Sequence, residues 1–157
     1  MKKIILKINN LSKNYHTKKT EIKAINNLNF DVYEDEILAI VGPSGCGKST
    51  LLSILSGQDT ESSGTIIKYN DLKIGYMLQT DSLFPWLTIK ENALLPLTIQ
   101  KKTTKNNIDK VIYLLKKYGL KDFISSYPKN LSVGMKQRVS LIRTLANNPN
   151  LLLLDEP

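Results

Sequence analysis

Residues 42–50, GPSGCGKST, combine three glycines with a lysine and three hydroxyl side chains and fit the spacing G-x-x-x-x-G-K-[ST]. Glycine leaves the backbone uncovered, so successive N–H groups can curl around the oxygens of a phosphate. From the composition of this chain, a chance match to the four fixed positions has a probability under about 1%. The candidate nucleotide-binding residues are therefore Gly42, Pro43, Ser44, Gly45, Cys46, Gly47, Lys48, Ser49 and Thr50.

Two side chains of this loop define the ligand further. Lys48 can reach the β- and γ-phosphates of a nucleotide, and the Ser49 hydroxyl can bind Mg²⁺. A helix that begins near Lys48 adds the positive end of its dipole. The loop predicts binding of a nucleoside triphosphate with magnesium, and the competing interpretation is a Gly/Ser-rich turn without a ligand. Cys46 is a tolerated small residue here, and a bound nucleotide would shield it from alkylation.

A pair of carboxylates follows the apolar run LLLL at residues 151–154. Successive strand residues point to opposite faces, so Asp155 and Glu156 are unsuited to ligating one metal ion together. Asp155 can orient the magnesium shell, and Glu156 can accept a proton from the water that attacks the γ-phosphorus. The alternative is a surface pair after a core strand, with Pro157 as a strand terminator in either case.

Elements that position these residues follow from periodicity and from Gly and Pro stops. Apolar or alternating runs predict strands at residues 4–8, 27–33, 37–41, 64–70, 73–79 and 151–155, of which 37–41 and 151–155 have the continuous apolar character of buried parallel strands. Helical spacing predicts helices at residues 48–57, 88–97, 104–119 and 132–148. Strand 37–41, the glycine loop and the helix from Lys48 follow one another in the order that phosphate binding requires.

The fold class predicted from this order is α/β, a phosphate-loop NTPase with an N-terminal antiparallel β subdomain. We place its core at about residues 1–83 and 134–157, and a helical insertion at about 84–133. At 157 residues, with 41% apolar and 23% charged residues, the chain has the composition of one soluble globular domain.

Charge and cysteine content indicate which kinds of partner and which cellular location to expect. The net charge is +8, but nearly all basic residues are lysines spread along the chain, which favours a solvated surface over a nucleic-acid interface. The sequence lacks both a signal-peptide pattern and an apolar run long enough to span a bilayer. With Cys46 as the single cysteine, we expect a cytoplasmic protein without direct nucleic-acid contact.

A third segment, LSVGMKQRVSLIRTLANNP at residues 131–149, resembles the LSGGQ signature and following helix of ATP-binding cassette (ABC) proteins. The resemblance covers essentially the whole chain. It implies that the signature residues contact ATP held by an opposite subunit, in a homodimer or a paired ABC ATPase. Ser132 can cap the following helix and leave its first N–H groups free for this anion. The signature residues are Leu131, Ser132, Val133, Gly134 and Met135.

The same resemblance assigns roles to further residues. Tyr15 lies where the family places an aromatic ring against adenine, and a Tyr ring can stack on a purine. Gln79 matches the glutamine that contacts both Mg²⁺ and the attacking water, so we expect Gln79 and Glu156 to be catalytic. Ser49, Gln79 and Asp155 are the expected metal-binding set. A Tyr near a strand and a Gln at a strand end are otherwise ordinary packing and surface residues.

The segment FPWLTIKEN at residues 84–92 is similar to the ATPases of importers for nitrate, sulfonate or taurine-like substrates. This resemblance implies a permease contact near Phe84–Trp86 and a location on the inner face of the cell membrane; the alternative is ordinary packing of these rings. Two other functions stay open: a non-transport ABC protein acting on nucleic acid or ribosomes, and a non-catalytic ATP-binding fragment.

The sequence departs from the family pattern in two places. Val133 replaces the first signature glycine, so we expect weaker closure on the phosphate. The dimer loop and switch histidine that follow the glutamate in the family have no counterpart, since the single histidine is His16. We therefore expect a cassette incomplete at its C-terminus, with weak or absent nucleotide binding and negligible turnover by the isolated 157-residue chain.

Overall fold

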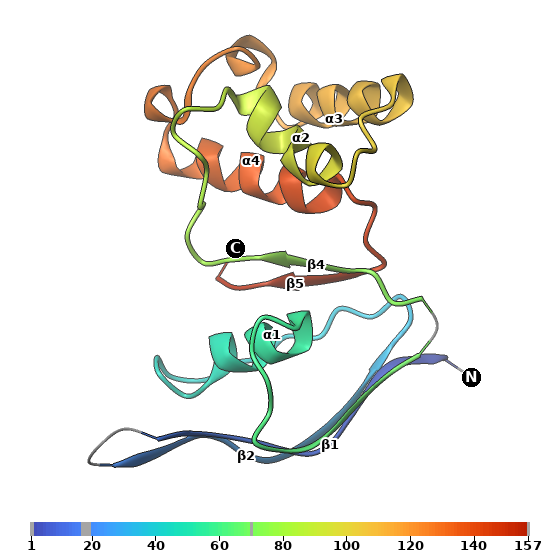
Figure 1. Ribbon diagram of the computed structural model, residues 1–157, viewed down its shortest axis with the longest axis vertical. Helices are drawn as coiled ribbons and strands as arrows, with labels where there is room; N and C mark the ends of the chain where they lie inside the picture. The colour runs from blue at the N-terminus through green and yellow to red at the C-terminus, as the bar shows by residue number, and fades with distance from the viewer. Residues whose placement is uncertain (1, 17–19, 70, 157) are drawn as a thin grey trace. The chain divides into compact units, whose positions relative to one another are not determined.

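The computed structural model describes residues 2–16, 20–69 and 71–156 (Figure 1). Asn70, predicted as the end of a strand, and Pro157, predicted as a strand terminator, lie outside this range. The chain divides into two compact units, Met1–Leu72 and Lys73–Pro157. The predicted limits of core and helical insertion stay a prediction.

The first unit contains a three-stranded antiparallel sheet. Its strands are β1 (Ile4–His16), β2 (Glu21–Tyr33) and β3 (Ser63–Lys68), in the order β2-β1-β3. This confirms the predicted antiparallel β subdomain. The first two strands extend well beyond the predicted ranges 4–8 and 27–33, because polar residues interrupt the apolar alternation on which those ranges rested.

An irregularity in β1 determines which residues of its second half face the core. Leu6 and Ile8 are buried on one face, and the register to β2 shifts between Ile8 and Leu11, where Asn10 has φ 49°. Such a bulge inserts an extra residue and changes which positions face the core. After it Leu11 and Lys13 are the buried residues, so odd-numbered positions replace even-numbered ones on this face.

Helix α1 (Lys48–Ser56) covers the sheet of the first unit (Figure 1). It buries Leu51, Leu52, Ile54 and Leu55. The helix ends where predicted, at Gly57 with φ 83°, whose N–H donates to the Ile54 carbonyl. Glycine adopts this left-handed conformation without the steric cost that other residues incur.

The predicted buried strand at residues 37–41 is wrong. These residues have no strand conformation, and Ile37 and Val41 are 99% and 92% exposed. A strand requires a neighbour that pairs with its backbone groups, and no strand of the described residues pairs with this segment. Residues 37–41 are apolar, but among the described residues they lack the partner strands that would hold them extended and buried.

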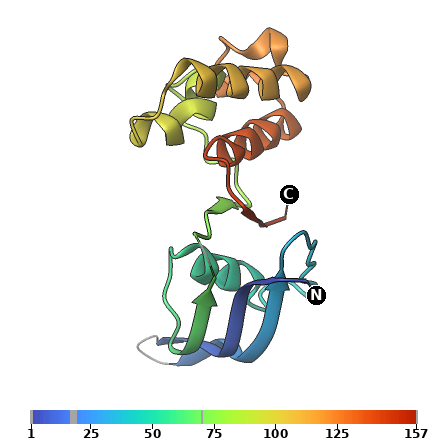
Figure 2. The ribbon, with the colours of Figure 1, turned by 90° about the vertical axis from the view of Figure 1, so that its right-hand side faces the viewer.

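The second unit is layered. Strands β4 (Ile74–Met77) and β5 (Leu151–Leu154) form a parallel pair, and helix α4 (Val133–Leu145) lies between this pair and helices α2 (Ile89–Ile99) and α3 (Lys105–Lys117) (Figures 1 and 2). Strand β5 is only partly buried: Leu153 is 7% exposed, whereas Leu152 and Leu154 are 38% and 39% exposed. The predicted strand is confirmed, but its apolar run alternates between a covered and an exposed face.

Polar side chains cap the helices of the second unit, and the cap predicted at Ser132 is confirmed. Thr88 and Glu91 form a reciprocal capping box at α2, Thr104 caps α3, and Ser132 caps α4. Two short 3-10 turns, Lys121–Phe123 and Pro128–Asn130, connect α3 to α4. The buried core that these elements share contains Ile89, Ala93, Leu94, Leu97, Val111, Leu115, Leu120, Leu131, Val139 and Ile142. Among the described residues, the helices are too short or too polar to cross a bilayer.

Candidate functional site

The glycine loop has the local conformation that the motif requires. Gly45 and Gly47 have φ 80° and 98°, in the left-handed region that favours glycine. A Cβ on Gly47 would lie 2.3 Å from the Ala24 carbonyl oxygen, so no side chain fits there. A Cβ on Gly45 would meet nothing within 4 Å, so this part of the loop is open to a ligand.

Lys48 and Ser49 begin helix α1 directly after the loop. The Lys48 Nζ donates hydrogen bonds to the carbonyl oxygens of Gly42 (2.9 Å) and Pro43 (3.1 Å). The ammonium group is therefore folded over the loop backbone, where a phosphate oxygen can replace a carbonyl as its acceptor. Together with the positive end of α1, this fits a bound phosphate group.

The two strands of the second unit bring Gln79 and Glu156 together. Because β4 and β5 run parallel, with Met77 opposite Leu154, the residues that follow them leave the sheet at the same edge. The Gln79 side-chain amide donates a hydrogen bond of 2.5 Å to the Glu156 carboxylate, across 77 positions of sequence. The structure thus places the two predicted catalytic side chains in contact.

The strand predicted through Asp155 ends at Leu154, and Glu156 has φ 49°, so the predicted alternation of strand residues does not apply to this pair, whose members differ in burial. Asp155 is 5% exposed and its N–H donates to the Met77 carbonyl, whereas Glu156 is exposed. The Tyr76 hydroxyl lies 3.5 Å from the Asp155 carboxylate. Oxygen atoms of Asp155 and Gln79, like the Ser49 hydroxyl, are the ligand type that Mg²⁺ prefers. No group of three or more His, Cys, Asp or Glu side chains among the described residues could hold a metal ion.

The signature segment begins helix α4. Leu131 is buried and anchors the segment, and the Ser132 hydroxyl accepts a hydrogen bond from the Met135 N–H at 3.4 Å. Val133 is 71% exposed, and a Cβ on Gly134 would meet nothing within 4 Å. The first turn of α4 is therefore accessible, as a contact with an anion from another subunit would require.

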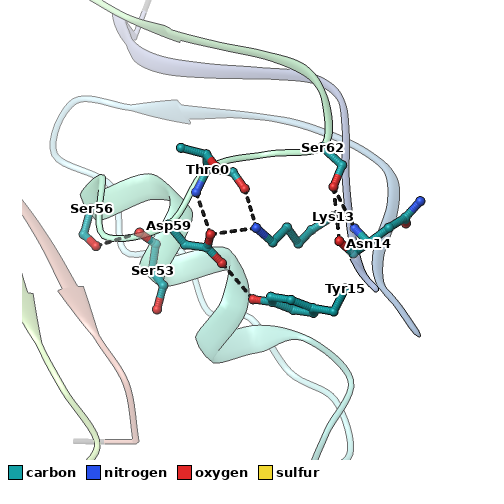
Figure 3. A network of polar contacts seen from close by, with 8 residues as sticks. All are labelled: Lys13, Asn14, Tyr15, Ser53, Ser56, Asp59, Thr60 and Ser62. Carbon is teal, nitrogen blue, oxygen red and sulfur yellow. Dashed lines mark hydrogen bonds and ion pairs between the residues drawn. The ribbon is translucent and has the colours of Figure 1, made fainter. Parts of the chain in front are cut away.

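Tyr15 belongs to a polar network that joins β1 to the segment after α1 (Figure 3). Its hydroxyl donates to Asp59 Oδ2 at 2.8 Å, and the Lys13 Nζ donates to Asp59 Oδ1 at 2.6 Å and to the Thr60 carbonyl at 2.7 Å. Hydrogen bonds from Lys13, then Tyr15, then the Thr60 N–H lower the pKa of Asp59 to about 2. Asp59 is therefore a carboxylate throughout the neutral range, and Tyr15 is held by its hydroxyl.

The segment after Gln79 is fixed to α4 by Arg143. Its guanidinium donates to the carbonyl oxygens of Asp81 and Ser82, both at 2.9 Å. Burial lowers the pKa of Arg143, with the Asp81 charge acting in the opposite direction. The guanidinium thus connects the helix of the signature segment to the loop that carries the predicted catalytic glutamine.

The exposed aromatic pair at residues 84–86 rests on a buried amide. Phe84 and Trp86 are 38% and 68% exposed, with ring centroids 5.1 Å apart. Asn92 is fully buried: it accepts from the Phe84 N–H at 2.8 Å, and its amide nitrogen lies within 3.1 Å of the carbonyls of Phe84, Leu87 and Thr88. This one side chain fixes the turn that displays both rings.

Sequence reasoning did not identify Lys13, Asp59, Asn92 or Arg143. Lys13 and Asp59 lie outside the quoted motifs, and Asn92 and Arg143 lie within quoted segments whose pattern does not show their partners, which are backbone carbonyls. One signal was available for Arg143: the chain has only two arginines, both on α4, among many lysines. A guanidinium in place of an ammonium favours a site with several fixed acceptors.

A phosphate loop, two carboxylates after a parallel strand and a capped signature helix together define a nucleotide-binding cassette. Residues 25–157 match the ABC transporter family, and the chain belongs to this family. Similar solved structures include two dimeric forms of the cassette MJ0796, one of them bound to ADP and Pi. Their TM-scores are 0.82 and 0.84 and their identities 33% and 36%, and the matches cover 96% of this chain and 73% of those chains. These matches confirm the predicted phosphate-loop fold class with its antiparallel β subdomain.

Similar curated proteins include the uncharacterized ABC transporter ATP-binding protein YtlC of Bacillus subtilis, 43% identical over 97% of this chain. The aliphatic sulfonates import ATP-binding protein SsuB of Bacillus cereus is 38% identical over 96% of the chain. The nitrate import ATP-binding protein NrtD of Synechocystis is 39% identical over 97%. The chain spans about 60% of the length of these relatives, with shares of 61%, 61% and 59%.

Proposed function

We propose that this protein is the ATP-binding subunit of an ABC import system, which binds and hydrolyses MgATP to drive a solute through a membrane permease. The observation that carries this proposal is the glycine loop with Lys48 folded over it. The import direction rests on similarity to proteins named as importers of sulfonates and nitrate. Its location would be cytoplasmic, at the inner face of the membrane.

The residues divide the chemistry among them. Backbone N–H groups of residues 44–47 and the Lys48 ammonium bind phosphate oxygens, and Tyr15 stacks on the adenine. The magnesium ion would be held by Ser49, Gln79 and Asp155, and it supplies charge neutralisation on the phosphates. Glu156 accepts the proton of the attacking water, and the amide of Gln79, in contact with Glu156, orients that carboxylate.

Two contacts with other chains complete the proposal. A second cassette, either another copy or a paired ABC ATPase, receives the signature residues 131–135 against its own nucleotide. The permease contacts the surface formed by Phe84 and Trp86, whose exposed rings are the kind of residue that anchors an interface.

Hydrolysis tests the proposal directly. In the longest available form of this polypeptide, phosphate release from MgATP is measured for the unaltered protein and for Glu156→Gln. We expect the substitution to lower kcat by about 10²-fold or more, because it removes the general base while retaining the shape of the side chain. Equal turnover by both proteins, or no turnover by either, would contradict the assigned activity.

A further inference from the structure

We propose that Lys13 and Asp59 are positioning residues for base recognition: they hold the Tyr15 ring in one orientation, so that a purine stacks on the face opposite Lys13. The inference rests on the proposed function, because it concerns how the nucleotide-binding residue Tyr15 is held. It adds two residues that lie outside every motif of the sequence.

The bulge of β1 places Lys13 and Tyr15 on the same side of the strand. Residues two apart in a strand share a face, and after the shift at Asn10 this face carries Leu11, Lys13 and Tyr15. Leu11 and Lys13 are buried, whereas Tyr15, at the end of the series, is 39% exposed. The ring thus extends from the sheet interior to the surface.

The end of helix α1 fixes Asp59. After Gly57 turns the chain, the N–H groups of Gln58 and Asp59 both donate to the Ser53 carbonyl, at 2.9 and 3.2 Å. The Asp59 carboxylate is then held by three donors: the Lys13 ammonium, the Tyr15 hydroxyl and the Thr60 N–H. An anion with so many short contacts has little freedom to move, and so has the hydroxyl bound to it.

Lys13 also restricts the ring itself. Its Nζ lies 4.8 Å from the centroid of the Tyr15 ring, within the range of a cation–π contact. One face of the ring is therefore covered by a cation that is itself bonded to Asp59 and to the Thr60 carbonyl (Figure 3). A flat aromatic ligand can approach the opposite face, which the hydroxyl bond and the cation together keep at a fixed angle.

Helix α1 connects the contacts of Lys13, Asp59 and Tyr15 to the phosphate loop. Lys48 and Ser49 lie in its first turn, and its last turn, through Ser53 and Gly57, holds Asp59. One rigid element thus sets the distance between the phosphate-binding and base-stacking groups. Preorganisation of this kind improves affinity by reducing the entropy lost when the ligand binds.

The experiment separates base recognition from phosphate binding. Dissociation constants for MgATP and for magnesium tripolyphosphate, which has no base, are measured by calorimetry in the longest available form of the polypeptide. The variants are Tyr15→Ala, Asp59→Asn, Lys13→Met and the double variant Tyr15→Ala/Asp59→Asn. Glu21→Gln is the matched control, since Glu21 is also a carboxylate bonded to β1, but to Asn14 instead of Tyr15.

We expect Tyr15→Ala to weaken MgATP binding by about 5- to 150-fold, the range for loss of one base–aromatic stack. Asp59→Asn and Lys13→Met should each weaken it by about threefold or more, while tripolyphosphate affinity stays within about twofold. In the Tyr15→Ala background, Asp59→Asn should not weaken MgATP binding further, because Asp59 acts through the ring. Glu21→Gln should bind both ligands like the unaltered protein.

Two results would overturn the inference while leaving ATP binding intact: equal losses for ATP and tripolyphosphate, or an Asp59→Asn effect that persists without the Tyr15 ring. Both would indicate a general structural role. Unchanged MgATP affinity in Asp59→Asn and Lys13→Met would also overturn it. Failure of the unaltered protein to bind either ligand would instead refute the proposed function, and the inference with it. Thermal unfolding of each variant identifies any that fail to fold. If Asp59→Asn is among them, the single variant Tyr15→Phe, which keeps the ring and loses the hydroxyl bond to Asp59, takes its place and should weaken MgATP binding but not tripolyphosphate binding.

Discussion

Lys48 makes the contacts that a phosphate has to replace. Its ammonium group is bonded to two loop carbonyls, so a triphosphate gains only the difference between charge-assisted bonds to phosphate and bonds to neutral carbonyl oxygens. The ammonium donor makes both kinds of bond charge-assisted, but a phosphate oxygen also carries the opposite charge, which adds Coulomb attraction. This difference, together with the N–H groups of the loop, makes the lysine an affinity determinant and not merely a structural residue.

Cys46 offers a chemical probe of the same loop. Its thiol is exposed and lies 4.0 Å from the Lys48 ammonium. We expect iodoacetamide to label Cys46, and MgATP to slow the labelling by about tenfold at saturation, because a bound triphosphate covers the loop. Mass spectrometry of the labelled protein over time gives both rates.

The control for this measurement is Lys48→Ala, in which MgATP should no longer protect the thiol. Equal labelling rates with and without nucleotide in the unaltered protein would show that Cys46 is not covered by a ligand. Protection that survives in Lys48→Ala would place the nucleotide elsewhere.

At the scale of single residues, the sequence identified groups that belong to a contiguous motif. The loop residues 42–50 have their required conformation because glycines at fixed spacing encode it locally. Contacts such as Lys13 with Asp59 span 46 positions and arise only when β1 and the end of α1 come together. Such pairs follow from tertiary structure, which spacing does not reveal.

Arg143 joins helix α4 to the loop that follows Gln79 by hydrogen bonds to the carbonyls of Asp81 and Ser82. Replacing it by methionine in Arg143→Met keeps much of the apolar stem but leaves the Asp81 and Ser82 carbonyls without these donors. We expect backbone amides of residues 80–84 to exchange with deuterium faster, and the free energy of unfolding to fall by about 1–3 kcal/mol. Hydrogen-exchange mass spectrometry and urea unfolding measure the two effects.

Arg138→Met is the matched control on the same helix. Arg138 donates to the carbonyls of Gly134 and Tyr118, which lie outside residues 80–84, so exchange of those residues should stay unchanged. Faster exchange of residues 80–84 in both variants would indicate general loosening of α4 instead of a specific connection.

At the scale of elements, helices with caps and strong periodicity were predictable and strands with missing partners were not. The stop at Gly57 and the N-terminal caps at Thr104 and Ser132 encode helix ends locally. Residues 37–41 have the composition of a buried strand, yet their conformation depends on neighbours that the described sheets do not provide. The length of β1 was missed for a related reason, because pairing with β2 and β3 holds its polar half extended.

At the scale of the whole molecule, the proposed function includes a second copy or a paired cassette that completes the nucleotide site. Val133, 71% exposed at the start of α4, occupies the position at which the signature would bring backbone close to a partner's phosphate. We expect Val133→Gly to strengthen MgATP-dependent dimerisation by about threefold or more, because it removes a β-branched side chain from this approach. Sedimentation velocity with Glu156→Gln as the common background measures the monomer–dimer equilibrium.

Gly134→Val supplies the opposite change one residue later, where a Cβ has open space within the isolated chain. Its folding should be little affected, but its dimerisation should be weaker. If Val133→Gly and Gly134→Val shift the equilibrium in the same direction, or leave it unchanged, this end of α4 does not face a partner's nucleotide.

The binding of MgATP to the glycine loop is the claim on which the other proposals depend. Calorimetric titration of the longest available form of the polypeptide with MgATP tests it, alongside Lys48→Ala. We predict saturable binding that Lys48→Ala weakens by about tenfold or more, since the charge-assisted bonds to phosphate are lost. Absence of saturable binding, or binding of equal strength in both proteins, would contradict the account.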